Sequence, residues 1–154
     1  MEDTTQAVYI ISTGAYLPGP PVNNDDMEHV LGLVGGKPSR YRRRILASNG
    51  ITQRHYAMDR QGRATHMADE LAAEAVKQAL ASRRMQIEDT TLLTVGTSLV
   101  TDVLMPGIAS MVHGRLGGHP MDILSCGGIC GAGAAALQSA RLSIKAGQHR
   151  TAVA

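Results

Sequence analysis

The chain has 154 residues, of which 44% are hydrophobic and 18% charged, and its formal net charge is +2. Such a composition can bury one core of ordinary domain size and excludes an intrinsically disordered chain. Phe and Trp are absent, no apolar run approaches the roughly 18 residues that cross a bilayer, and the two cysteines follow no signal-like N-terminus. We therefore expect a cytoplasmic protein that binds neither nucleic acid nor a membrane.

The first part of the chain mixes apolar runs with turn signals. "AVYIISTGAYLPG" (7–19) predicts a buried strand, and "NNDDMEHVLGLVG" (23–35) has N-cap residues and helical spacing that predict a short helix. "GGKPSRYRRRI" (35–45) breaks this helix and forms a basic segment. "NGITQRHYAM" (49–58) predicts a turn and then a short strand.

The rest of the chain alternates between helical and strand patterns. The clearest helix is "THMADELAAEAVKQALASRRM" (65–85), which carries one apolar stripe. Later elements are predicted as a strand at 90–98, a helix from Pro106 to 116–118, a strand at 121–124, a helix from about Cys130 and a strand at 150–154. This alternation indicates an α/β fold with a mixed or mainly parallel sheet.

Both cysteines lie in "MDILSCGGICGAGAAALQSA", where an apolar run is followed by a glycine-rich turn and a small-residue helix. Cys130 would lie at the helix N-terminus, where free backbone N–H groups and the helix dipole favour a thiolate. From position alone, a buried cysteine that serves only packing remains the alternative. Cys126, four residues earlier, is expected to be a core residue at the strand end.

Other charged and ligand-type residues give weaker signals. Arg40, Arg42, Arg43 and Arg44 form either a solvated face or a site for an acidic group, such as a phosphate or an acidic carrier-protein helix. The two cysteines have no second ligand pair nearby, and the six histidines lack metal-binding spacing, so no metal site is expected.

A series of segments resembles the N-terminal half of the β-ketoacyl-acyl-carrier-protein synthase III family, which has the thiolase fold. The segments run in the family's order and at close to its spacings from 7 to 154. They are "IISTGAYLP", "NGITQRHYA", "ADELAAEAVKQAL", "IEDTTLLTVGTS" and "MPGIASMVHGRLG". The resemblance implies that residues 1–154 form an N-terminal thiolase-like half-domain, with a mixed sheet and packed helices, that is incomplete without the C-terminal half.

The resemblance also implies which cysteine is the nucleophile. "CGGI" from Cys126 is similar to the family's Cys-Ala-Gly-Phe signature, but spacing from Gly117 forward and from Leu137 and "KAG" backward places the family's cysteine at Cys130. We therefore choose Cys130, with Cys126 as the second choice. By position, Met105 is expected to line the acyl pocket near a dimer interface.

Three positions depart from the family pattern. Arg44 stands where the family typically has a Trp that stacks on the adenine of coenzyme A, and Ser48 replaces an Arg that helps to hold this cofactor. Ser125 stands where an Asp usually precedes the nucleophile. The basic segment, with Arg40, Arg43 and Arg44 as expected substrate-binding residues, suits a carrier-protein-bound acyl donor.

The activity implied by the resemblance is acyl transfer. An acyl thioester of coenzyme A or of an acyl carrier protein would acylate Cys130, and a malonyl-type or other acceptor would then take the acyl group, with no further cofactor. Family members complete the site with a His and an Asn from the second half of the fold, and a homodimer is expected. The alternative is a non-catalytic half-domain or partner subunit that stabilises an active thiolase-fold protein.

Overall fold

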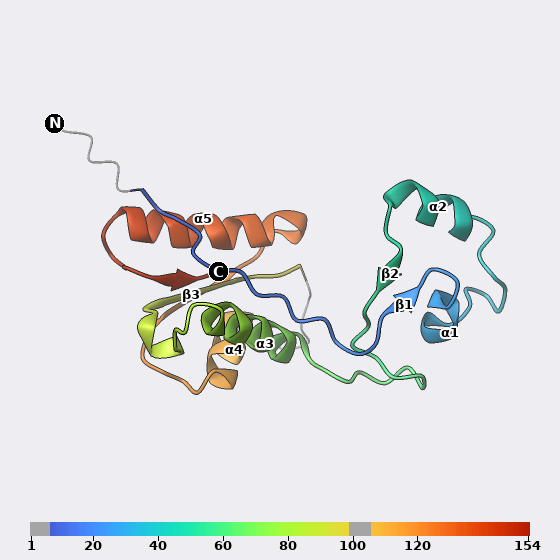
Figure 1. Cartoon of the computed structure of the whole chain (residues 1–154), viewed down its shortest axis with the longest axis horizontal. Coiled ribbons are helices and arrows are strands. Elements are labelled where there is room, and N and C mark those ends of the chain that lie inside the picture. The colour runs from blue at the N-terminus through green and yellow to red at the C-terminus, as the bar shows by residue number, and fades with distance from the viewer. Residues whose placement is uncertain (1–6, 99–105) are drawn as a thin grey trace. The chain divides into compact units, whose positions relative to one another are not determined.

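Figure 1 shows a computed structural model of the chain, which describes residues 7–98 and 106–154. The chain forms two compact units. One comprises Leu17–Leu71, and the other combines Met1–Tyr16 with Ala72–Ala154. The two cysteines belong to the second unit and the arginine segment to the first.

A parallel sheet forms the centre of the unit that contains Ala72–Ala154. β3 (Leu92–Gly96) is the middle strand, with β4 (Asp122–Cys126) on one side and β5 (Ala152–Val153) on the other. Both neighbours pair with β3 in parallel, and the register sets Gly96 opposite Cys126. The expected parallel α/β arrangement is confirmed. Since the carboxyl ends of β3 and β4 coincide, Cys126 lies at the edge of the sheet from which parallel strands lead into site-forming loops.

Helices cover both faces of this sheet (Figure 1). α5 (Ala132–Lys145) packs on one face, where its small residues Ala132, Ala136 and Ala140 are buried. Because these side chains follow an i, i+4, i+8 pattern, the helix comes close enough for the Thr94 hydroxyl to donate a hydrogen bond to the Ala136 carbonyl at 3.0 Å. α4 (Ile108–Arg115) packs on the other face through Ile108, Ala109 and Val112.

α3 (Ala68–Ala81) is the long helix that the apolar stripe predicts, and the short helix η1 (Ile87–Asp89) connects it to β3. The segment that precedes residue 17 runs along α3. A Cβ atom built on Gly14 would collide with the Ala75 carbonyl oxygen and approach the Ala79 nitrogen at 2.6 Å. Only glycine therefore allows this contact.

The Leu17–Leu71 unit is built from two helices and a small antiparallel pair of strands. These are β1 (Val22–Asn23), α1 (Met27–Leu31), α2 (Arg42–Asn49) and β2 (Gln53–Arg54). The carboxylate of Glu28 in α1 accepts a hydrogen bond from the Arg42 guanidinium in α2 at 2.8 Å. Because both side chains are largely shielded from water, this ion pair joins the two helices more firmly than an exposed pair would.

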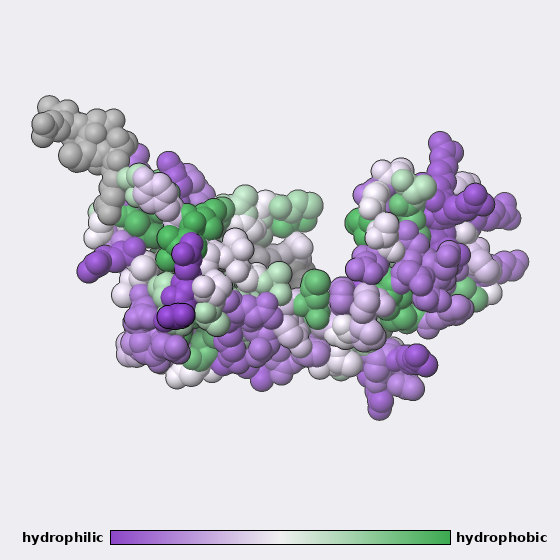
Figure 2. Space-filling view, in the orientation of Figure 1, coloured by the Kyte–Doolittle hydropathy of each residue, from purple (hydrophilic) through white to green (hydrophobic). Residues whose placement is uncertain are grey.

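The strand predicted at 7–19 is wrong. Residues 7–19 do not form a buried strand: no ladder pairs them with another strand in the described part of the chain, and Tyr9 and Ile10 are 77% and 71% exposed. Apolar side chains at the surface there are visible in Figure 2. The basic segment is also more than a helix breaker, because its second half opens α2. The helix predicted at 23–35 is shorter than expected and forms only at Met27–Leu31.

Candidate active site

The two cysteines lie on either side of a strand–turn–helix junction. β4 ends at Cys126, Gly127 and Gly128 form the turn, and the short helix η2 (Ile129–Gly131) leads into α5 at Ala132. The helix was expected from about Cys130, and Cys130 instead lies in η2, one residue before the N-cap Gly131. The thiol-bearing residue is thus still at the amino end of α5, where free N–H groups gather.

Two unusual backbone angles shape this junction. Gly128 has φ 133°, which is accessible to glycine alone. Ile129 has φ 49° although it is β-branched, and its side chain is 75% exposed. A β-branched residue in this region stores strain of about 1–3 kcal/mol. The strained turn presents Cys130 immediately before the helix, and such strain is concentrated at functional sites in proteins.

Gly96 explains how α5 can begin directly over the end of the sheet. A Cβ atom at this position would collide with the Ala132 carbonyl and lie 2.7 Å from the Gly133 nitrogen. The absence of a side chain on β3 therefore brings the first turn of α5 against the carboxyl end of the strand. The first residues of α5 are themselves small, so a ligand could approach the junction closely.

The two thiols differ in their accessibility. Both cysteines are free, Cys130 is exposed and Cys126 is partly buried. The backbone carbonyl of Cys126 accepts a hydrogen bond from the Thr97 N–H at 3.4 Å, which extends the pairing of β3 and β4 by one step. Cys126 therefore behaves as the end of a strand, whereas Cys130 is the thiol that a bulky thioester can reach.

Ser125 has a structural role at this edge of the sheet. Its hydroxyl accepts a hydrogen bond from the Ala109 N–H at 3.0 Å and so satisfies one free donor in the first turn of α4. The same oxygen lies 2.7 Å from the position that a Cβ atom on Gly107 would occupy. A small hydroxyl side chain fits this narrow space between β4 and the helix.

The remaining predicted site residues are distributed over other parts of the chain. Arg40, Arg43 and Arg44 are exposed and lie in the Leu17–Leu71 unit, where hydrophilic residues gather over α2 (Figure 2). In the described part of the chain none of the three has an ion-pair partner, whereas Arg42 is held by Glu28. Met105 lies outside the described residues.

Two histidines of the Ala72–Ala154 unit have their contacts away from the cysteines. His113, in the last turn of α4, contacts the His119 carbonyl through Nε2, whereas Ser125 contacts the first turn of the same helix. Within residues 7–98 and 106–154, no group of three His, Cys, Asp or Glu residues is arranged to hold a metal ion. Over the same residues, no helix is long and apolar enough to cross a membrane.

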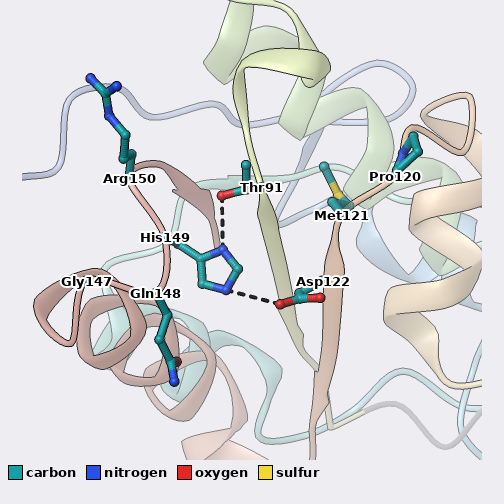
Figure 3. A pocket seen from close by; sticks show the side chains of 8 residues that line it. All are labelled: Thr91, Pro120, Met121, Asp122, Gly147, Gln148, His149 and Arg150. Atoms are coloured by element: carbon teal, nitrogen blue, oxygen red, sulfur yellow. Dashed lines mark hydrogen bonds and ion pairs between the residues drawn. The ribbon is translucent and has the colours of Figure 1, made fainter.

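A hollow of about 540 Å³ lies at the opposite, amino-terminal edge of the sheet (Figure 3). The His149 ring bridges the starts of the strands: Nδ1 is 3.0 Å from the Thr91 hydroxyl and Nε2 is 3.3 Å from an Asp122 carboxylate oxygen. The sequence gives no signal for this cluster, because its three members lie far apart along the chain. It joins strand ends and has no contact with either cysteine.

Comparisons with known proteins show which sequences and structures the chain is similar to. No protein-family model matches the chain. A β-ketoacyl-acyl-carrier-protein synthase III from Neisseria gonorrhoeae is 32% identical over 152 residues, which cover 96% of this chain and 42% of that relative. The chain is thus similar to the N-terminal half of this synthase. It spans about two fifths of the length of the curated relatives it matches.

Two solved structures share the fold of this chain over about two fifths of their own length. The tetronic acid condensing enzyme AbyA1 matches with a TM-score of 0.71 and 29% identity, over 87% of this chain and 40% of that chain. The 3-oxoacyl-acyl-carrier-protein synthase III from Aquifex aeolicus matches with a TM-score of 0.70 and 24% identity, over 90% of this chain and 41% of that chain. The expected fold class, the N-terminal half of a thiolase-like fold, is confirmed.

Proposed function

We propose that this chain supplies the nucleophilic cysteine of a synthase III-type acyltransferase, and that the nucleophile is Cys130. The thiolate sulfur would attack the carbonyl carbon of an acyl thioester, forming a new C–S bond as the bond to the donor sulfur breaks. The donor leaves as a thiol after taking up a proton, and the enzyme keeps the acyl group as a thioester. A malonyl-type or other acceptor then takes the acyl group from Cys130.

The observation that carries this proposal is the exposed thiol of Cys130 on the turn that opens α5. The free N–H groups and the dipole of a 14-residue helix favour negative charge at this end. Gly131 and Gly133 leave room for the thioester, because a Cβ atom built on either would meet no atom within 4 Å.

The acyl donor is proposed to be a thioester of an acyl carrier protein, with coenzyme A as the alternative carrier. Arg40, Arg43 and Arg44 are exposed and lack acidic partners in the described part of the chain. Exposed guanidinium groups suit an acidic protein helix or a phosphate. The thiol itself carries the acyl group, so no further cofactor is needed.

Acyl transfer by Cys130 also requires a general base and a donor that stabilises the oxyanion. Among the described residues of the Ala72–Ala154 unit, His113 contacts the His119 carbonyl and His149 contacts Thr91 and Asp122. A general base and an oxyanion-stabilising donor would come from the C-terminal half of the fold, in the same or a separate polypeptide, as a His and an Asn. Met105 is proposed to line the acyl pocket of a homodimer.

A second candidate is a non-catalytic half-domain that stabilises an active partner. The specific observation in its favour is Ser125, whose side chain is engaged in capping α4 at the position where the family usually has an Asp. In this case Cys130 would be a surface cysteine without a chemical role.

The test is formation of a β-ketoacyl product by the chain combined with the C-terminal half of the fold, using an acyl donor and a malonyl carrier protein. We expect product with the wild-type chain and with Cys126→Ala, and loss of product with Cys130→Ala. Product formation that survives Cys130→Ala would overturn the assignment of the nucleophile. A wild-type assembly that folds but forms neither product nor acyl-enzyme would support the non-catalytic candidate.

A further inference from the structure

A second hollow, of about 640 Å³, lies in the Ala72–Ala154 unit and is distinct from the cysteine junction. It is bounded by the last turns of α3, the turn after this helix, η1, and the end of α4 (Figure 1). Since the first turn of α4 contacts Ser125, the last turn lies at the far end of that helix from the junction. The proposed acyl transfer makes no use of this hollow.

The side chains that line the hollow are cationic at its rim and apolar at its base. Lys77, Arg84 and Arg115 supply positive charge, against a single carboxylate from Glu88. Leu80 is only 7% exposed, and Met85, Ile87 and Leu116 are half-buried. A surface of this kind matches a ligand that combines a negative group with an aliphatic part.

Arg84 is the residue that distinguishes the hollow from an ordinary surface depression. Its φ of 55° is left-handed. The Arg84 N–H donates to the Ala81 carbonyl at 3.1 Å, and the Met85 N–H donates to the Leu80 carbonyl at 3.0 Å. This pair of hydrogen bonds defines the Schellman ending of a helix, whose left-handed position is normally occupied by glycine. An arginine in this conformation is strained. The same conformation places the Arg84 side chain in the lining of the hollow.

The charge of Arg84 is available to a ligand. Lys77 is held by the Glu74 carboxylate at 2.7 Å, whereas Arg84 is exposed and has no carboxylate partner in the described part of the chain. A guanidinium group binds carboxylates and phosphates through paired N–H donors. Glu88 at the same rim would repel a large polyanion, which favours a ligand with one anionic group.

We propose that this hollow binds an amphiphilic anion, with a carboxylate or phosphate head group at Arg84 and an aliphatic chain over Leu80, Met85, Ile87 and Leu116. The head group forms charge-assisted hydrogen bonds with the guanidinium, and burial of the chain removes apolar surface from water. Both parts of the ligand are needed for binding.

Titration of the full chain with octanoate and with octyl phosphate, followed by amide chemical shifts, tests this site. We expect saturable shifts at the amides of 80–88 and 115–116. Inorganic phosphate and acetate, which lack the chain, should bind at least about tenfold more weakly, and so should octylammonium, whose charge is reversed. Equal binding of octylammonium, or the absence of saturation with both amphiphilic anions, would overturn the proposal.

Arg84→Gly provides the matched variant because it relieves the strain while it removes the cation. We expect its melting temperature to rise by about 2–4 °C and its affinity for octanoate to fall by about tenfold. Arg84→Lys should keep most of the binding, and Arg141→Ala, which removes an exposed arginine of α5, should leave binding unchanged. Unchanged affinity in Arg84→Gly would refute the site. Since Cys130→Ala should bind octanoate normally, the outcome is independent of the proposed acyl transfer.

Discussion

The hydroxyl of Ser125 accepts a hydrogen bond from the Ala109 N–H at 3.0 Å and thereby joins the end of β4 to the first turn of α4. The N-cap residue of this helix is Gly107, whose lack of a side chain leaves the helix without a cap of its own. The cap is therefore supplied from a strand that follows the helix in sequence. This hydrogen bond holds the end of β4 against α4, and the turn that leads to Cys130 begins at that end of the strand.

Ser125→Ala should destabilise the chain by about 1 kcal/mol, because it leaves the Ala109 N–H without its partner. Unfolding in urea measures this change. Ser139→Ala is the control, since the Ser139 hydroxyl only donates back to the Ala135 carbonyl within its own helix and its removal should cost less than about 0.5 kcal/mol. Equal effects of the two substitutions would contradict the capping role of Ser125.

Gly96→Ala should destabilise the chain by about 3 kcal/mol or more, because the new methyl group would collide with the backbone of Ala132. Gly114→Ala is the matched substitution in α4, where a Cβ atom would meet nothing within 4 Å. It should stabilise the chain by up to about 1 kcal/mol through helix propensity. Thermal unfolding of both variants measures these opposite changes in stability. A Gly96→Ala variant that unfolded at the wild-type temperature would contradict the predicted collision.

The turn at Asp59 should respond to acid. The pKa of the Asp59 carboxyl is lowered, chiefly by the hydrogen bond from the Arg63 backbone N–H; desolvation opposes this effect, and the Arg63 side chain and the Gln61 N–H lower the pKa further. Because the folded pKa is depressed, the carboxylate stabilises the turn above the unfolded pKa of about 3.9. This contribution is lost as the pH falls through the lower, folded pKa.

The Arg63 amide reports this titration in NMR spectra. We expect its shift to change with a midpoint below that of a free aspartate, and the change to vanish in Asp59→Asn. A midpoint at or above about 3.9 would show that the hydrogen bonds at 2.9 Å from the two backbone amides do not hold the carboxylate in solution.

His149 should matter more to stability than its ion-pair partner. Its side chain is 11% exposed and bridges Thr91 and Asp122, whereas the Asp122 side chain is 78% exposed (Figure 3). His149→Ala should cost about 1–2 kcal/mol, because it removes the packing of a largely buried ring and its link between the starts of β3 and β4. Asp122→Asn should cost less than about 1 kcal/mol, because an exposed ion pair contributes little. Urea unfolding in which Asp122→Asn is the more damaging change would contradict this ranking.

The elements around the cysteines could be predicted because local patterns and tertiary packing agree there. The apolar stripe of 65–85 became α3 (Ala68–Ala81), and the apolar run at 90–98 became β3 (Leu92–Gly96). The strand starting with "MDIL" extends to Cys126. The small-residue run after Cys130 also gave α5, although two residues later than expected, because the strained turn at Ile129 precedes the helix.

Other features depend on contacts that one sequence does not display. The apolar residues of 7–19 predict burial, but a strand also needs a neighbour with free N–H and C=O groups, and the described residues offer it none. α2 was not predicted from the arginine-rich segment, although Gly50, with φ 68°, marks the end of that helix. The link between Ser125 and Ala109 and the one between His149 and Asp122 join segments distant in the chain, so local patterns carry no trace of them.

Whether Cys130 is the nucleophile is tested most directly by peptide-mapped mass spectrometry. The chain is first combined with the C-terminal half of the fold and exposed to an acyl thioester. We expect one acyl group on the peptide that contains Cys130, retained in Cys126→Ala and absent in Cys130→Ala. An acyl group on Cys126, or no acyl group on either thiol in a folded assembly, would contradict the assignment of Cys130 as the nucleophile.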